Sequence, residues 1–225
     1  MATSTRELTS FLAEPERRLL RAIAARIPLR WRPNHFTALG VLAATGVGVA
    51  YALARFHPAW LWLASALLVV QWFGDSLDGT LARVRGIERL RYGYYLDHMT
   101  DAYSTVAIGA GIALSHYVHL GLALALVVLY LALSINVYLE SEVFGRFRLG
   151  YSRIGPTEAR ILLIVFNVVL ALYHELPAGV WPELRVVANL AAGLLAAGLA
   201  TALVARFVRN VYVLARLEPQ FGRKG

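Results

Sequence analysis

The sequence predicts an all-α, polytopic membrane protein with six transmembrane helices, preceded by an amphipathic helix on the membrane surface. Of its 225 residues, 58% are hydrophobic and only 16% are charged, a composition that argues against an ordinary soluble domain. Six stretches of roughly 20 apolar residues are each long enough to cross a bilayer core about 30 Å thick. Because the connections between them are short and no linker-like segment divides the chain, we expect one compact bundle.

The six predicted spans fill most of the chain after residue 32. We place them at Phe36–Phe56, Ala59–Arg83, Gly93–Tyr117, Gly121–Phe144, Thr157–Tyr173 and Val186–Val208. Residues 1–225 then form a single domain, with the bundle at 33–225. In the sixth span Gly193, Ala197 and Ala200 suit close helix packing, and a contact between two copies there makes a homodimer an open expectation.

The segment 1–32 interleaves large apolar side chains with arginines at spacings that suit a helix lying in the membrane surface. A solvated basic tail is the alternative, which the number of large apolar side chains disfavours. Pro15 is expected to interrupt the helix. The residues that carry the pattern are Leu8, Phe11, Leu12, Leu19, Leu20, Ile23 and Ile27 with Arg17, Arg18, Arg21 and Arg26.

Basic residues are distributed unevenly along this topology. Every Lys and Arg except Arg55 and Arg185 falls in or next to the N-terminal segment, the second-to-third and fourth-to-fifth connections, or the C-terminal end. Because cytoplasmic loops carry an excess of Lys and Arg, both termini and the site described below are expected on the cytoplasmic side of the membrane. The topology in the lipid bilayer thus accounts for the basic residues behind the net charge of +8, and no nucleic-acid partner is expected.

Four aspartates occupy two consecutive spans, where ionisable residues are costly and usually mark a site. Asp75 and Asp78 are three residues apart and Asp97 and Asp101 four apart, so each pair lies on one face of its helix. The first pair ends one span on the cytoplasmic side, and the second pair begins the next span from that side. We therefore expect the four carboxylates to converge in a cavity open to the cytoplasm.

This concentration of negative charge requires cations. Asp75 and Asp78 lie near a helix C-terminus, where anions are disfavoured, and Arg83 and Arg85 are candidate ion-pair partners. The chain has no cysteine, and oxygen ligands without histidine or thiolate suit Mg²⁺ or Mn²⁺. A pair of such ions serves displacement at phosphorus. The predicted metal ligands are Asp75, Asp78, Asp97 and Asp101.

The two aspartate segments also carry a family resemblance. One reads DSLDGTLAR from Asp75 to Arg83, and the other reads GYYLDHMTD from Gly93 to Asp101. Together they resemble the D-x-x-D-G-x-x-A-R…G-x-x-x-D-x-x-x-D motif of the CDP-alcohol phosphotransferases, with every fixed position present. The six-span architecture is also similar to that of the family. The resemblance implies an enzyme of phospholipid biosynthesis that takes a CDP-linked donor and an alcohol acceptor and releases CMP.

The resemblance further implies roles for individual residues. The first three aspartates would hold the metals that bridge the donor's pyrophosphate, while Asp101 would approach a metal and accept the proton of the attacking hydroxyl. Gly79 and Ala82 would let the nucleotide approach the helix closely, and Arg83 would bind phosphate oxygens. Gly93 would admit close packing at the rim of the cavity, although the glycines also suit ordinary helix packing.

Weaker signals concern the substrates. Asn34 and Thr37 open the first span in a pattern similar to the family's cytidine-binding segment, and equally resemble an ordinary helix cap. His98 and the segment 155–158 resemble the choline and ethanolamine phosphotransferase branch, in which a small head group is CDP-linked and a lipid alcohol attacks. A CDP-linked lipid donor is the arrangement we favour. Candidates for binding a phosphorylated acceptor are Arg146, Arg148, Arg153 and Arg160.

A transporter for divalent cations or protons is the main rival from another class, because membrane carboxylates also build ion pathways. A transporter predicts acidic groups at mid-membrane or on both sides. The visible cluster lies at one end of its spans, which favours an enzyme. A purely structural membrane protein would not need four aspartates on two adjacent helices.

Overall fold

The computed structural model describes residues 12–144, 156–173 and 181–218, except for the side chains of 181–184. Every regular element in these ranges is an α-helix, which confirms the predicted all-α fold. The helices are α1 (Ala13–Ala24), α2 (Pro33–Ala54), α3 (Trp60–Arg85), α4 (Leu90–Leu114), α5 (Leu120–Phe144), α6 (Pro156–Tyr173) and α7 (Trp181–Leu217).

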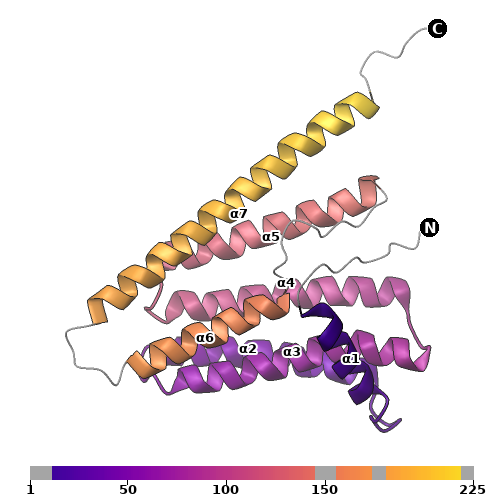
Figure 1. Ribbon diagram of the computed structural model, residues 1–225, viewed down its shortest axis with the longest axis horizontal. Coiled ribbons are helices and arrows are strands. Elements are labelled where there is room, and N and C mark those ends of the chain that lie inside the picture. The colour runs from indigo at the N-terminus through magenta and orange to yellow at the C-terminus, as the bar shows by residue number, and fades with distance from the viewer. Residues whose placement is uncertain (1–11, 145–155, 174–180, 219–225) are drawn as a thin grey trace.

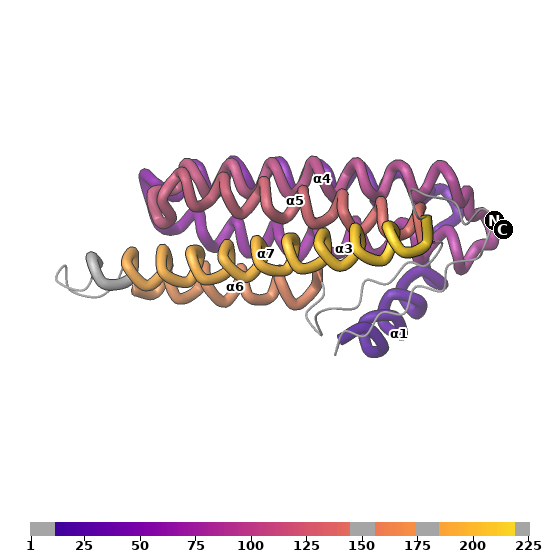
Figure 2. Tube along the Cα trace, turned by 90° about the horizontal axis from the view of Figure 1, so that it is seen from above, coloured from indigo at the N-terminus to yellow at the C-terminus, as the bar shows by residue number. Residues whose placement is uncertain are grey.

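The long helices run up and down beside one another (Figure 1). Helix α2 packs against α3 and α4, α6 packs against α3, and α5 packs against α4 and α7. Helix α7 leans away from the bundle towards its C-terminal end (Figure 1), and α1 lies across one end of the bundle (Figure 2). Helix α3 is therefore contacted by α1, α2 and α6.

Each of the six predicted spans corresponds to one helix, α2 to α7, and α7 continues beyond the predicted end to Leu217. Five of these helices are long and apolar enough to cross a membrane: α2, α3, α5, α6 and α7. Helix α4 has a similar length but a more polar first half, which contains Asp97 and Asp101. The helix with the least typical membrane composition is thus one of the two that carry the aspartates.

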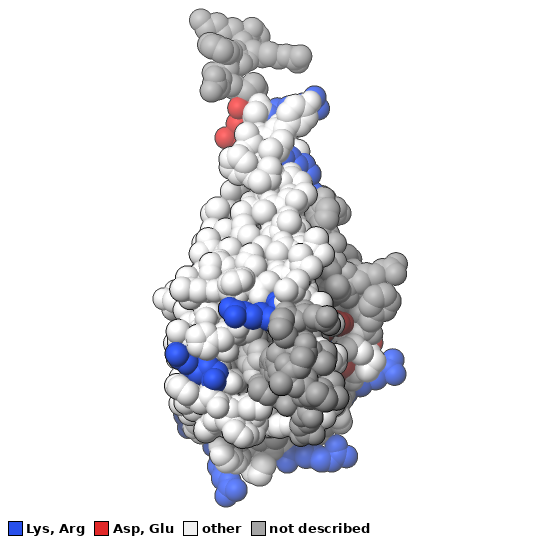
Figure 3. Space-filling model, turned by 90° about the vertical axis from the view of Figure 1, so that its left-hand side faces the viewer, with Lys and Arg blue, Asp and Glu red and all other residues white. Residues whose placement is uncertain are grey.

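The end of the bundle farthest from α1 carries few charges. Arg55 and Arg185, the two basic residues assigned to the outer side, line one pocket together with His116 and His119. The visible surface at this end is mostly uncharged, with isolated basic side chains (Figure 3). The distribution agrees with the charge asymmetry of the sequence, while the side of the membrane that each end faces stays a prediction.

Glycines bring α2 against α3 and α4 with backbone touching backbone. A Cβ atom at Gly74 would lie 2.6 Å from the backbone nitrogen of Gly40 and 2.7 Å from the carbonyl oxygen of Phe36. A Cβ atom at Gly111 would collide with the backbone of Gly48. Small residues allow this close approach in membrane bundles. Because Gly74 directly precedes Asp75, the α2–α3 crossing holds the first aspartate beside α2.

Helix α7 packs through different small residues from those that the sequence suggested. Ala188, Ala192 and Ala196 are buried, whereas a Cβ atom at Gly193 would meet nothing within 4 Å and Ala197 is exposed. Residues four apart share a helix face, so Gly193 and Ala197 lie off the face that contacts the bundle, whereas Ala200, four residues after Ala196, lies on that face and is half-buried. Their expected packing role within the chain is wrong for Gly193, and the homodimer stays a prediction.

Helix α1 packs on the bundle through its apolar side. Leu20 and Ala24 are buried against Leu77 and Leu81 of α3. The predicted amphipathic helix is present, and in this structure its apolar side covers protein. Pro15 does not interrupt it, because Pro15 lies in the first helical turn, where its missing N–H has no intrahelical partner.

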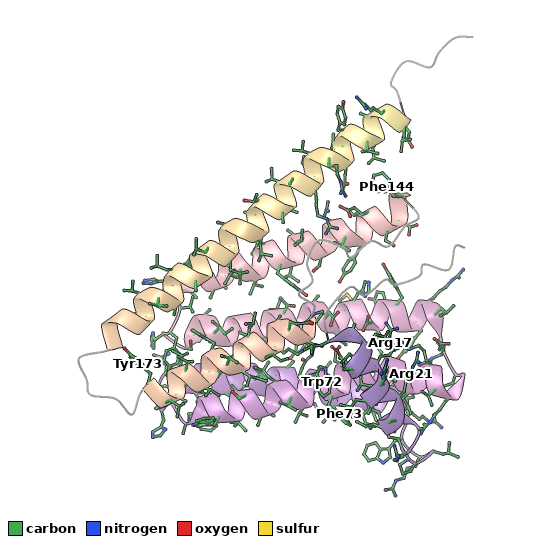
Figure 4. The ribbon with its side chains drawn as sticks, viewed as in Figure 1. Arg17, Arg21, Trp72, Phe73, Phe144 and Tyr173 are labelled. Carbon is green, nitrogen blue, oxygen red and sulfur yellow. The ribbon has the colours of Figure 1, made fainter. Side chains whose placement is uncertain are left out.

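A single carboxylate joins α1 to α3 and α6. Glu16 accepts hydrogen bonds from Trp72 Nε1 at 2.7 Å, Ser76 Oγ at 3.2 Å and Thr157 Oγ1 at 2.9 Å. Trp72 lies where α1 crosses the bundle (Figure 4). Since Ser76 directly follows Asp75, these bonds fix α1 and the start of α6 next to the first aspartate.

A buried ion pair joins α5 to α7. Arg206 Nη2 lies 3.3 Å from the Glu140 carboxylate, and the two side chains are only 9% and 10% exposed. Asn136 and Asn210 donate further hydrogen bonds to this carboxylate at 2.8 Å and 2.6 Å. In the sequence, Arg206 is one of the basic residues of the C-terminal end that indicate topology. The structure instead buries it as the partner of Glu140, an ion pair that the sequence pattern does not predict.

Candidate active site

Asp78 is held by α2 and by its own helix. Thr37 Oγ1 donates a hydrogen bond to Asp78 Oδ2 at 2.6 Å, and the backbone N–H of Gly79 donates to Asp78 Oδ1. The pair brings together two residues predicted from separate sequence segments. Thr37 therefore contacts the aspartate cluster directly, whereas its predicted contact with nucleotide stays a prediction.

Asp75 pairs with an arginine of α6. Arg160 Nη2 lies 2.6 Å from Asp75 Oδ2, and Arg160 Nε donates to Gln71 Oε1, also at 2.6 Å. The sequence instead suggests Arg83 and Arg85 as candidate partners. Arg85 instead donates to the carbonyl oxygens of residues 27, 28 and 31, in the connection between α1 and α2. That alternative is wrong for Arg85, because its guanidinium is committed to this backbone.

The aspartates of α4 face the same region as those of α3. Asp75 and Asp97 both act electrostatically on Asp78, and Asp97 and Asp101 both act on Tyr138 of α5. Tyr130, two turns before Tyr138, is in turn influenced by Asp101, Asp75 and Arg160. These couplings indicate that the carboxylates of α3 and α4 lie in one region, next to α2, α5 and α6, while their convergence in a single cavity stays a prediction.

An aromatic stack lies beside Asp97. The His98 ring lies between Tyr94 and Tyr138, with ring centroids 4.1 Å and 4.2 Å away. His98 Nδ1 is 3.6 Å from Asp97 Oδ2, and neither ring nitrogen has a hydrogen-bond partner among the described residues. These ring contacts join α4 to α5 beside Asp97.

Three residues near the carboxylates were not predicted from the sequence: Tyr130, Tyr138 and Gln71. Polar side chains on one face of an apolar span are the signal that could have found them.

The donor set fits Mg²⁺ or Mn²⁺ chemically, because it consists of carboxylate oxygens that repel one another electrostatically. In the described part of the chain, however, no three acidic or histidine side chains form a ready-made metal cluster. Asp75 is instead neutralised by Arg160. The four metal ligands therefore stay a prediction. For Asp75 to bind a metal ion, its carboxylate would have to release the Arg160 guanidinium.

The predicted nucleotide-binding residues of α3 lie around the guanidinium of Arg83. A Cβ atom at Gly79 would lie 3.3 Å from Arg83 Nη1, so this guanidinium rests over Gly79. Arg83 Nη2 also donates to Thr80 Oγ1 at 3.2 Å, and Ala82 is half-buried. The absence of bulk at Gly79 thus leaves room for a planar cation one turn beyond Asp78.

Asn34 connects the starts of α2 and α4. Its Nδ2 donates to Tyr92 Oη at 3.0 Å, and its Oδ1 accepts from Arg89 Nη2 at 3.4 Å. Gly93, the next residue after Tyr92, is exposed, and a Cβ atom there would meet nothing within 4 Å. The close helix packing expected at Gly93 is therefore wrong, while its predicted place at the substrate stays a prediction.

The remaining predicted positions divide between described and undescribed residues. Helix α6 begins at Pro156, as the segment 155–158 indicated, and Glu158 accepts a hydrogen bond from the backbone of Leu12 at 3.3 Å. Of the four arginines proposed to bind a phosphorylated acceptor, only Arg160 can be placed. Outside the described residues lie Arg146, Arg148, Arg153 and Gly155.

Two comparisons with known proteins bear on this site. A family model described as CDP-alcohol phosphatidyltransferase matches residues 30–212, a range that includes all four aspartates. A phosphatidylinositol phosphate synthase of Cutibacterium acnes is 37% identical over 82 residues. That match covers 36% of this chain and 37% of the relative, so the chain aligns with only about a third of the length of this relative.

Proposed function

We propose that this chain, which belongs to the CDP-alcohol phosphatidyltransferase family, transfers a phosphatidyl group from a CDP-linked lipid to an acceptor hydroxyl and releases CMP. Family membership and several apolar helices make it an integral membrane protein of phospholipid biosynthesis. The observation that carries the proposed chemistry is the shared environment of the four carboxylates on α3 and α4. Their mutual repulsion suits them to cations, and cations suit a pyrophosphate donor.

In the proposed reaction, the acceptor hydroxyl oxygen attacks the donor phosphorus that bears the lipid alcohol. A new P–O bond forms, the bond to the bridging pyrophosphate oxygen breaks, and CMP leaves. The hydroxyl proton passes to Asp101. Thr37 orients Asp78 through their hydrogen bond, and Arg83 offers two N–H groups to pyrophosphate oxygens. Bound Mg²⁺ or Mn²⁺, held by the four aspartates, would supply charge neutralisation at the donor and at the departing CMP.

The proposed direction of transfer draws on the relative and on one basic side chain near the site. The name of the Cutibacterium acnes relative favours a phosphatidyl group as the one transferred, and a phosphate-bearing inositol as an acceptor to test. A basic group is available near the carboxylates, since Arg160 lies at the start of α6. The opposite arrangement, a CDP-linked head group with a lipid alcohol acceptor, uses the same carboxylates and differs only in which substrate carries the lipid.

A donor panel tests the proposed function. Purified protein in lipid nanodiscs with Mg²⁺ or Mn²⁺ receives CDP-diacylglycerol with polar alcohols that include inositol phosphate, or CDP-choline with diacylglycerol. We expect CMP release from CDP-diacylglycerol that depends on the acceptor. Release from CDP-choline alone would reverse the direction of transfer. No CMP release from either donor, with Mn²⁺ uptake into protein-containing vesicles, would support the transporter instead.

The site is proposed to face the cytoplasm, because the α3–α4 connection beside it belongs to the arginine-rich side of the protein. A single cysteine replacing Glu88, which lies in that connection, checks the side. We expect a membrane-impermeant thiol reagent to label it in permeabilised cells only, while a cysteine replacing His57 is labelled in intact cells. Labelling at position 88 in intact cells would overturn the topology.

A further inference from the structure

Arg160 is the cation that the structure places on the first aspartate of the site. Its guanidinium is bonded at 2.6 Å to both Asp75 and Gln71, which lie one turn apart on α3. The Arg160 and Asp75 side chains are only 14% and 21% exposed. Gln71 is buried at 3% exposure and directs the guanidinium through Nε. Two fixed acceptors on one helix face therefore hold the positive charge at Asp75.

The surroundings explain why a cation is needed at this point. Asp75 lies inside the predominantly apolar helix α3, where an uncompensated charge is costly. Asp75 and Asp97 both raise the negative potential at Asp78, so the aspartates also repel one another. Arg160 reaches this cluster from α6 and acts on the same tyrosine, Tyr130, as Asp75 and Asp101. In the structure Arg160 supplies the positive charge next to Asp75.

We infer that Arg160 is an exchangeable counter-cation of the proposed metal site, which occupies Asp75 when metal is absent and releases it when metal binds. The inference rests on one part of the proposed function, the binding of metal by the aspartates, and does not depend on the transfer reaction. A guanidinium bonded to a carboxylate opposes a second cation at the same oxygen, because like charges repel and the guanidinium already takes one acceptor position of Asp75 Oδ2. Metal affinity is therefore held down by Arg160, and metal binding moves its guanidinium off Asp75.

Mn²⁺ binding without donor or acceptor tests the inference independently of activity. Isothermal titration of the full chain in nanodiscs compares the wild type with Arg160→Gln, which removes the charge but keeps a polar side chain. We expect Arg160→Gln to bind Mn²⁺ at least about tenfold more tightly, because the variant lacks the competing positive charge at Asp75. A tenfold change in Kd corresponds to about 1.4 kcal/mol. Arg160→Lys, which retains the charge, should stay within about threefold of wild type. The matched control Arg209→Gln changes an arginine that is 3.8 Å from Glu140 on α5, and should change nothing.

A second measurement needs no variant. Phenylglyoxal modifies exposed arginines, and mass spectrometry reports the modified positions. Mn²⁺ should accelerate modification of Arg160 in the wild type and leave Arg209 unchanged. Unchanged or weaker Mn²⁺ binding by Arg160→Gln, or slower modification of Arg160 with Mn²⁺, would overturn the inference while the proposed function stood. If the wild type bound no Mn²⁺, the inference about Arg160 and the proposed metal-dependent function would both be overturned. Asp78→Asn, which lacks a proposed metal ligand, would then give the same Mn²⁺ titration as the wild type.

Discussion

Replacing Asp101 with asparagine is expected to lower the rate of CMP release by about 10²- to 10⁴-fold, the contribution typical of a general base. The substitution keeps the size of the side chain but removes the group that accepts the hydroxyl proton. The fold and binding of the CDP-linked donor should persist. Rapid-quench measurement of CMP release, with protein saturated in donor and metal before acceptor is added, separates this step from binding.

Asp78→Asn is the matched comparison for Asp101→Asn. Asp78 is held by Thr37 and is proposed to bind metal, so its loss should weaken metal-dependent donor binding as well as turnover. If Asp101→Asn released CMP at near the wild-type rate under saturation, the proton would have to go elsewhere. His98 would then be the next residue to test, because its Nδ1 lies 3.6 Å from Asp97.

Gly74→Ala is expected to destabilise the protein, although alanine normally favours a helix over glycine by about 1 kcal/mol. The added Cβ atom would lie 2.6 Å from a backbone nitrogen of α2, which no side-chain rotation can relieve. Overpacking of this kind costs about 1–3 kcal/mol, and about 2–4 °C in melting temperature for each kcal/mol in a chain of this size. Because α2 would be pushed from α3 beside Asp75, activity should fall too. Thermal unfolding in detergent measures the first effect.

Gly193→Ala is the control for Gly74→Ala, since both glycines lie inside long helices and a Cβ atom at Gly193 meets nothing within 4 Å. Gly193→Ala should leave the melting temperature unchanged or raise it slightly. Equal melting temperatures for the two variants would contradict the backbone contact between α2 and α3.

The helices and the aspartates were predictable because their signals are local. Spans of apolar residues indicate membrane helices one at a time, and the spacings of Asp75, Asp78, Asp97 and Asp101 place each pair on one helix face. Periodicity and spacing along one segment were sufficient for these conclusions. Thr37 was singled out by a motif at the start of its span, but its contact with Asp78 was not predicted and its contact with nucleotide stays a prediction.

The contacts between distant segments were not predictable in the same way. Arg160 was predicted only as a topology signal and as a candidate for binding a phosphorylated acceptor, and it is the packing of α6 on α3 that turns it towards Asp75. Arg206 was treated likewise, until α5 placed Glu140 opposite it. Gly93 was misjudged because a motif glycine does not reveal whether another helix lies next to it. Partner choice across a bundle depends on helix rotation and tilt, which a single chain pattern does not fix.

The central claim is that the aspartates of α3 and α4 use divalent metal to release CMP from a CDP-linked donor. The most direct measurement is CMP release by the wild-type protein in nanodiscs with CDP-diacylglycerol and its acceptor, first in excess EDTA and then after Mg²⁺ or Mn²⁺ is restored. The account predicts background release in EDTA and recovery with either ion. Undiminished turnover in excess EDTA would contradict it.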